Sequence, residues 1–315
     1  MKYRPKHIAE YALLRAVMFL TSILPYRAAL GVGWFVALIA FHIFRFRRKE
    51  TMRRLHSVFG DRFTERQYRH IAWISLRNLA FNVIEFMANR KMTREDFDRI
   101  FEYGDKLEIM KKQIATGKGA VLAGPHMGTW EMLGRAFALN GIPIISIAAH
   151  QRNPLVNDYF DRMRAETELK PLIRGESGIL KKIIRRMRNG EVMAILPDVR
   201  MPTPALEVPF LGGTANIGTG AATFARTTGL PIFPFIIKRH GWSRHEIKKL
   251  PIIYPDMSLD KTTDIERMMR TLMAGIEREI KADPEQWFWY NKRWILDPID
   301  NKKKEKKEET NDKNQ

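Results

Sequence analysis

The stretch AVLAGPHMGTWEML, residues 120–133, decides the fold, because it changes from a strand pattern to a helix pattern across one short turn. Ala120 to Ala123 is an apolar run of strand length, and Gly124 and Pro125 interrupt it. An amphipathic helix is predicted to begin at Trp130. His126 therefore lies between the end of a buried strand and the start of a helix, which is where open α/β sheets bind ligands.

The same alternation of short apolar runs and amphipathic helices continues toward the C-terminus, after a helical layer predicted over residues 57–118. It predicts an α/β fold with a central mixed or mostly parallel sheet flanked by helices. The expected strands are residues 120–123, 143–148, 171–173, 192–196, 232–237 and 247–253. The expected helices are residues 130–139, 154–168, 177–188, 219–227 and 264–282.

The N-terminus carries two apolar stretches, residues 11–24 and 28–44, and a basic cluster follows the second. We interpret residues 1–50 as a hydrophobic helical membrane anchor with a basic flank, either a hairpin or a slanted interfacial element. The alternative is a helix pair buried in the globular domain. Residues 51–298 are then the catalytic domain, and the charged residues 299–315 are predicted to be a disordered tail. Because basic residues flank the apolar stretches, the positive-inside rule favours a cytoplasmic face for the rest of the chain.

The composition indicates which classes of binding partner to expect, but it does not choose one of them. The formal net charge is +19, which favours anionic partners such as phospholipid headgroups, nucleic acid or an acidic protein. No recognised nucleic-acid-binding module accompanies this charge, so nucleic acid is not expected. The chain has no cysteine, which excludes a thiol nucleophile and Cys-ligated metal sites.

His126 and Glu131 form a candidate catalytic pair in an HX4E motif. Acyl transfer to a hydroxyl requires a base, and a histidine held in one tautomer by a carboxylate supplies it. The spacing alone is weak evidence, since eight histidines and 35 acids in 315 residues give about 0.9 such pairs by chance. His56 and Asp61 share the spacing but have no strand before them.

Several sequence segments, taken in their order along the chain, show a family resemblance. They are GPHMGTWE at 124–131, RNP at 152–154, LPD at 196–198, VPFLGG at 208–213, ATFARTTGLPIFP at 222–234 and DPEQWFWYNKRW at 283–294. In this order, over about residues 8–297, the chain resembles the bacterial lipid A biosynthesis acyltransferases of the lysophospholipid acyltransferase superfamily. It departs from the common family pattern at Thr129, Leu211, Gly213 and Asn291, in segments closer to the substrate than to proton transfer.

The resemblance implies an acyltransferase that moves a fatty acyl chain from acyl carrier protein to a hydroxyl of a lipid A precursor, late in lipopolysaccharide biosynthesis. His126 is then the general base and Glu131 orients it, with no cofactor, no metal and no covalent acyl-enzyme required. One alternative is a lysophospholipid or other glycolipid acyltransferase of the same superfamily, with acyl-CoA also possible as donor. Another is a non-catalytic, membrane-attached binding protein.

Five further residues are candidates for substrate binding. Gly128 would leave the turn open for a substrate to approach. Arg152 and Arg200 could bind phosphates of the donor or acceptor, and otherwise would be solvated charges. Asp198 and Asn153 could orient a substrate group or an arginine, or else could be ordinary cap or turn residues. The basic run at 181–188 could dock acyl carrier protein or could be the solvated face of a helix.

Overall fold

The computed structural model describes residues 3–148, 152–165, 172–173 and 177–299. The predicted disordered tail lies almost wholly outside them. The helices are α1 (Pro5–Ile23), α2 (Tyr26–His42), α3 (Arg48–Phe59), α4 (Glu65–Ala88), α5 (Arg94–Ile100), α6 (Lys106–Ala115), α7 (Trp130–Leu139), α8 (Pro154–Ala165), α9 (Ile179–Arg188), α10 (Gly220–Thr228) and α11 (Lys261–Ala282), with the 3-10 turns η1 (Asn89–Lys91) and η2 (Pro284–Gln286).

The strands are β1 (Phe101–Glu102), β2 (Ala120–Ala123), β3 (Ile144–Ile145), β4 (Ile147–Ala148), β5 (Leu172–Ile173), β6 (Val192–Ile195), β7 (Leu206–Phe210), β8 (Gly213–Ile217), β9 (Ile232–His240) and β10 (Arg244–Lys249). The central sheet has the order β1-β10-β9-β2-β6-β3. Every neighbouring pair is parallel except β9 and β10. The prediction of a mixed, mostly parallel sheet flanked by helices is confirmed.

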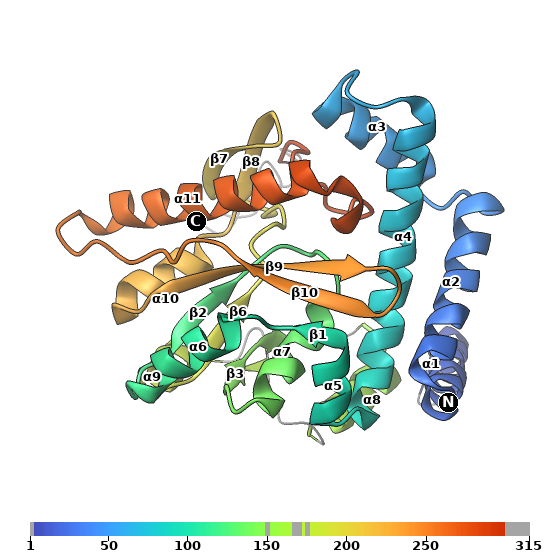
Figure 1. The fold of residues 1–315 in the computed structure, drawn as a ribbon, viewed down its shortest axis with the longest axis horizontal. Helices are drawn as coiled ribbons and strands as arrows, with labels where there is room; N and C mark the ends of the chain where they lie inside the picture. The colour runs from blue at the N-terminus through green and yellow to red at the C-terminus, as the bar shows by residue number, and fades with distance from the viewer. Residues whose placement is uncertain (1–2, 149–151, 166–171, 174–176, 300–315) are drawn as a thin grey trace, which may run out of the picture.

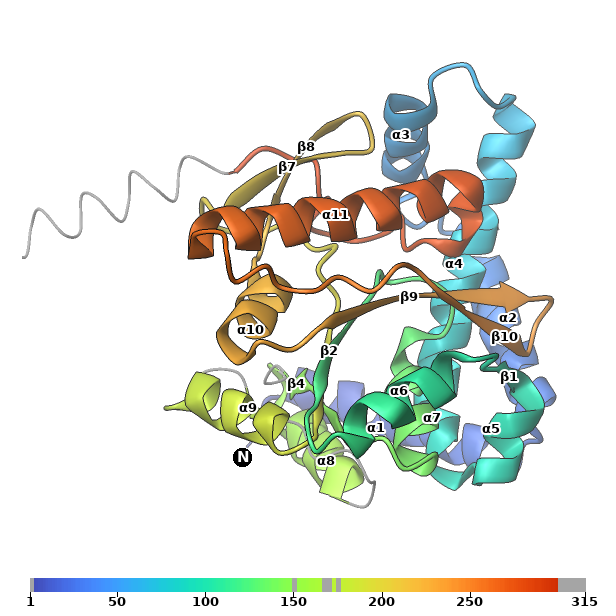
Figure 2. The same ribbon diagram turned by 60° about the vertical axis from the view of Figure 1, so that its left-hand side comes forward.

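Strand β2 is buried on both faces, which explains its unbroken apolar sequence. Val121 and Ala123 face a core shared with α10 and α11, whereas Ala120 and Leu122 face a core shared with α5, α6 and α7. Figure 2 shows α11 and α10 on one side of this sheet and α6 and α7 on the other. The sheet is thus a layer covered on both faces, and its strand ends are the edge at which open α/β sheets bind ligands.

Several details of the predicted strands differ from the structure, among them β1, which lies within the segment predicted to be helical, and β9, which continues to His240. The segment 143–148 divides into β3, which joins the central sheet, and β4, which pairs with β5. Strand β10 begins earlier than predicted and ends at Lys249, since Pro251 has no N–H for a sheet bond. The hairpin of β7 and β8 was not predicted.

Helix α4 lies between the N-terminal helices and the central sheet (Figure 1). Its start is fixed by a capping box, in which Thr64 and Gln67 each accept a hydrogen bond from the backbone N–H of the other. Helices α1 and α2 both contact α4, and they lie along the side of α4 that faces away from α11. Among the described residues, no helix combines the length and apolar character needed to cross a bilayer. The predicted N-terminal helix pair is therefore present, while its role as an anchor remains a proposal.

Candidate active site

The turn that carries His126 is held by the C-terminal segment after α11. The backbone N–H of Phe288 donates to the His126 carbonyl at 3.1 Å, and the N–H of Gly128 donates to the Gln286 carbonyl at 3.4 Å. Met127 and Trp287 form the antiparallel bridge between these two bonds. The turn is thus held in place by a segment that lies about 160 residues later in the chain.

The carboxylate that contacts the His126 ring is Asp198. Its Oδ1 lies 2.7 Å from His126 Nδ1, and its Oδ2 accepts the His126 backbone N–H at 2.8 Å. Trp287 Nε1 also donates to Oδ2 at 2.8 Å. Asp198 is only 3% exposed, whereas the His126 side chain is 21% exposed. The arrangement leaves Nε2 as the ring nitrogen that can accept a proton when Nδ1 carries the hydrogen shared with Asp198.

Strand register explains why His126 and Asp198 meet. Strands β2 and β6 are parallel neighbours, and Ala123 at the end of β2 is paired with Ile195 at the end of β6. His126 follows Ala123 by three residues, and Asp198 follows Ile195 by three residues. Because the carboxyl ends of parallel strands share one edge of a sheet, the two side chains emerge side by side. The segments GPH and LPD are equivalent positions of this edge.

Burial disfavours the charged forms of His126 and Asp198, but each charge stabilises the other. Burial alone lowers the pKa of the His126 imidazole, but the Asp198 carboxylate, and after it Glu131, raise that pKa above its usual value. Burial alone would raise the pKa of Asp198, but His126 and the Trp287 N–H hold it below its usual value. Asp198 is therefore ionised at neutral pH and stabilises the imidazolium that forms when His126 takes a proton.

Glu131 lies where the sequence predicted it, but another carboxylate makes the hydrogen bond to the His126 ring. It lies in the first turn of α7 with an exposed side chain, and its backbone N–H donates to Asn82 Oδ1 at 3.4 Å. Its charge contributes to the raised pKa of His126. The hydrogen-bonded contact that fixes the ring, however, is made by Asp198, which the sequence indicated only as a possible substrate-orienting residue.

A buried polar stripe on α4 attaches to the elements around His126. Its spacing of three, four and three residues places all four members on one helix face, and they are Ser75, Asn78, Asn82 and Glu85. At the start of the stripe, Ser75 Oγ donates to the Trp287 carbonyl (2.6 Å) and Asn78 Nδ2 donates to the Glu285 carbonyl (3.4 Å). Further along, Asn82 Oδ1 accepts from the Glu131 N–H, and Glu85 accepts from Arg239. One helix thus positions the C-terminal segment, α7 and β9.

The end of this stripe is a fully buried ion cluster. Glu85 accepts from Arg239 at 2.7 and 2.6 Å and from the Tyr26 hydroxyl at 2.7 Å, and His245 Nε2 lies 3.3 Å from its Oε1. Burial alone would raise the pKa of Glu85, but Arg239 and His245 hold it well below its usual value. The cluster joins α2, α4, β9 and β10.

Gly128 has a structural reason to be glycine. Its φ is +61°, and a Cβ there would lie 2.5 Å from the Ile237 carbonyl oxygen of β9. The residue is buried. It therefore allows the turn to pack against the sheet, which corrects the expectation that it keeps the turn open to substrate.

The other three predicted binding residues do not converge on His126. Arg152 is exposed at the start of α8. Asn153 is buried, and its Nδ2 donates to the His7 carbonyl and to Glu10, both at 2.9 Å, so it attaches α8 to α1. Arg200 follows Asp198 by two residues and donates to the Pro298 carbonyl at 2.7 Å. These contacts give Asn153 and Arg200 structural partners.

A small pocket adjoins the His126 and Asp198 pair. Its lining comes from that pair and the C-terminal segment, and consists of His126, Asp198, Trp287, Phe288, Asn291, Trp294 and Ile295. The tryptophans of this segment are buried, so they pack in the core and do not form an exposed aromatic surface. Within the described residues, no cluster of three or more His, Asp or Glu side chains could hold a metal ion.

The fold and the site define a class of α/β protein with a histidine and carboxylate pair at the strand ends of a mostly parallel sheet. The sequence model of the family described as bacterial lipid A biosynthesis acyltransferase matches residues 2–295. The chain belongs to this family.

Curated relatives carry two kinds of name. The phosphatidylinositol mannoside acyltransferase of Mycobacterium tuberculosis (strain CDC 1551 / Oshkosh) is 27% identical over 216 residues, 67% of this chain and 64% of that protein. The lipid A biosynthesis acyltransferase of Haemophilus influenzae is 28% identical over 187 residues, 58% of this chain and 56% of that protein. The chain thus spans less than two thirds of the length of these two relatives. A solved structure, the 1-acyl-sn-glycerophosphate acyltransferase of Thermotoga maritima, aligns with 80% of this chain and 95% of its own at a TM-score of 0.37 and 14% identity.

Proposed function

We propose that the protein transfers a fatty acyl chain from the thioester of acyl carrier protein to a hydroxyl of a lipid A precursor. The observation that carries the proposal is the 2.7 Å contact between His126 Nδ1 and Asp198 Oδ1 at the strand ends. It supports general-base chemistry, because it fixes the ring and its tautomer. Family membership supports acyl transfer as the reaction.

In the proposed mechanism, Nε2 of His126 removes the proton from the acceptor hydroxyl as its oxygen attacks the thioester carbonyl. A tetrahedral intermediate forms, and its collapse breaks the C–S bond. The imidazolium returns its proton to the departing thiolate, so the enzyme ends as it began. Asp198 orients the ring and stabilises its charged form, and Glu131 adds a negative potential nearby. The acyl group thus passes directly from the thioester sulfur to the acceptor oxygen.

Alanine at His126 and asparagine at Asp198 test this proposal. Loss of a positioned general base or its orienting carboxylate is expected to lower turnover by about 100-fold to 10,000-fold while the protein stays folded. Glu131→Ala is expected to lower turnover as well. The matched control is His56→Ala, which has the same sequence spacing to an acid but bonds Glu65 on the surface at 2.8 Å. Near-normal turnover in His126→Ala would refute the assignment.

A second acceptor class is favoured by the relatives. Two of the curated relatives are named phosphatidylinositol mannoside acyltransferases, so a mannosylated or otherwise glycosylated lipid is the alternative to a lipid A precursor. Both acceptors offer a hydroxyl to the same base. Competition between purified acceptors for one labelled acyl donor distinguishes them. Mass spectrometry of lipid A with and without the gene gives the same answer in cells.

Acyl carrier protein is the proposed donor, and α9 is the proposed docking element. Its exposed residues are mainly cations, namely Lys181, Lys182, Arg185 and Arg188, which complement an acidic carrier. Charge reversal of Lys181 and Arg185 together should raise KM for acyl carrier protein thioesters and leave KM for acyl-CoA unchanged. An equal effect on both donors would argue against docking at α9.

We also propose attachment to the cytoplasmic face of the inner membrane through the N-terminal helices. Ten large apolar side chains are exposed on α1, α2 and the residues just after α2, which is unfavourable in water unless a lipid phase covers them; they are Ile8, Leu13, Phe19, Leu20, Ile23, Phe35, Val36, Ile43, Phe44 and Phe46. Cosedimentation with anionic vesicles tests this. Replacing Phe35 and Phe44 with serine should release the protein from the vesicles.

A further inference from the structure

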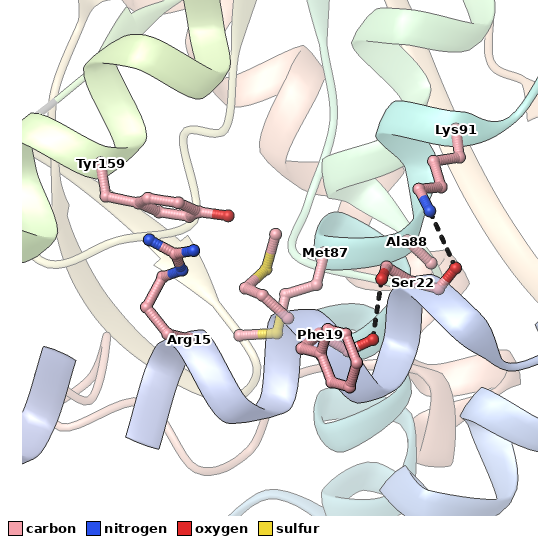
Figure 3. A pocket seen from close by; sticks show the side chains of 8 residues that line it. Arg15, Phe19, Ser22, Met87, Ala88, Lys91 and Tyr159 are labelled. Carbon is pink, nitrogen blue, oxygen red and sulfur yellow. Dashed lines mark hydrogen bonds between the residues drawn. The ribbon is translucent and has the colours of Figure 1, made fainter. Parts of the chain in front are cut away.

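A second pocket lies away from His126, between the N-terminal helices and the catalytic domain (Figure 3). Its volume is about 220 Å³, well above what a single water molecule needs. It is lined from α1, α4, η1 and α8 by Arg15, Met18, Phe19, Ser22, Met87, Ala88, Lys91 and Tyr159. It shares no residue with the pocket beside His126.

The lining combines apolar walls with two cations. Met18, Phe19 and Met87 supply flexible or flat apolar surface of the kind that accommodates an alkyl chain. Arg15 and Lys91 flank these walls, as Figure 3 shows. The lining contains no aspartate or glutamate. The pocket therefore suits a molecule that is both anionic and apolar.

Both cations are held in place by uncharged partners. Arg15 donates to the Tyr11 hydroxyl at 3.0 Å, and its guanidinium lies 5.3 Å from the centre of the Tyr159 ring. Lys91 donates to the Ser22 carbonyl at 3.0 Å, near the C-terminal end of α1. Among the residues that the structure describes, neither cation forms a salt bridge with a carboxylate. Their charge is thus available to an anion that enters the pocket.

The position of the pocket points to a membrane lipid as its source of ligand. Phe19 lines the pocket and is 66% exposed, and it belongs to the same helix as the exposed Leu13 and Ile23. A lipid lying against this face could place a chain between α1 and α4 while its phosphate reached Arg15 and Lys91. Basic pockets between helices bind anionic headgroups in this way.

We infer that this pocket binds one anionic phospholipid of the surrounding membrane, with its phosphate on Arg15 and Lys91 and part of an acyl chain against Met18, Phe19 and Met87. The bound lipid completes the packing between α1, α4 and α8. The site is separate from the proposed acyl-transfer site. Its occupant is retained and is not a reactant.

The test uses the purified full chain and a short-chain phosphatidylglycerol, dihexanoyl phosphatidylglycerol, below its micelle concentration. Calorimetry should give saturable binding of one lipid per chain, about tenfold tighter than for dihexanoyl phosphatidylcholine. Inorganic phosphate should bind much more weakly than the phosphatidylglycerol, because it lacks the chain. Equal binding of the two lipids, or binding of free phosphate as tight as that of the lipid, would overturn the proposal.

Three variants locate the binding. Arg15→Gln removes one cation and should weaken the binding of phosphatidylglycerol about tenfold. Ala88→Leu fills the cavity without altering any charge or the exposed face of α1, and should weaken it at least as much. Lys6→Gln is the matched control, since it removes a cation from the same helix outside the pocket, and should bind normally.

Unchanged binding in Ala88→Leu would show that the lipid lies elsewhere and would overturn the site, provided that thermal melting confirms a folded variant. His126→Ala separates this inference from the proposed function, because it should lose acyl transfer and retain lipid binding. A failure of acyl transfer in the unaltered protein would leave the lipid result standing, and the reverse also holds.

Discussion

Replacement of Trp287 with phenylalanine tests how the pKa of His126, the proposed general base, is set. The indole N–H is one of three donors to Asp198, the other two being the backbone N–H and ring of His126. A hydrogen bond to a charged group contributes about 1.5–3 kcal/mol, and one pKa unit corresponds to about 1.36 kcal/mol. Without that donor, Asp198 becomes a stronger acceptor for the proton on Nδ1 and stabilises the imidazolium more. If roughly half of the lost bond energy is transmitted, the pKa of His126 rises further, by about one unit.

The assay is the pH dependence of kcat/KM for acyl transfer. A general base must be neutral, so a higher pKa of His126 moves the acidic limb of the profile to higher pH by about one unit. Trp289→Phe is the control, because its indole donates to the Pro284 carbonyl and not to Asp198. An unshifted acidic limb in Trp287→Phe, or an equal shift in the control, would refute the reasoning.

Three further substitutions address the framework. Glu85→Gln leaves Arg239, which is fully buried, without its carboxylate and should lower the free energy of unfolding by about 3–5 kcal/mol in urea titrations; a loss under about 1 kcal/mol would contradict the cluster's role. Gly128→Ala forces a Cβ against the β9 backbone at positive φ and should cost about 1–3 kcal/mol by thermal melting, whereas wild-type stability would show that the turn can move. Ser75→Ala removes a 2.6 Å bond to the Trp287 carbonyl and should lower kcat with KM unchanged; a change in KM alone would exclude a positioning role.

Much of the fold was predictable because its signals are local. The helix at 130–139 and the strand at 120–123 were predicted with the bounds that the structure shows, since a buried parallel strand is continuously apolar and the helix follows a Gly-Pro break. The hairpin of β7 and β8 was missed. The turn between its strands uses Leu211 at φ +51°, an unusual residue for that conformation, so the usual turn signal is weak there.

The site was predicted in part. His126 follows from a local pattern, but its carboxylate partner depends on which strands are neighbours, and that is a long-range property. Asp198 nevertheless had a usable signal, because it follows the strand at 192–195 by the same interval that separates His126 from its own strand. Trp287 and the polar stripe of α4 had no such signal. Their contacts join segments about 50 to 210 residues apart in the chain.

The polar stripe of α4 has a practical consequence for work with purified protein. A shortened chain beginning after α2 would lose the Tyr26 hydroxyl from the Glu85 cluster and uncover the apolar side of α4 around Phe81 and Ile84. The same helix carries Ser75, which supports the segment beside Asp198. The apolar N-terminal helices are therefore part of the packed structure, and deleting them to gain solubility should also disturb the His126 and Asp198 pair.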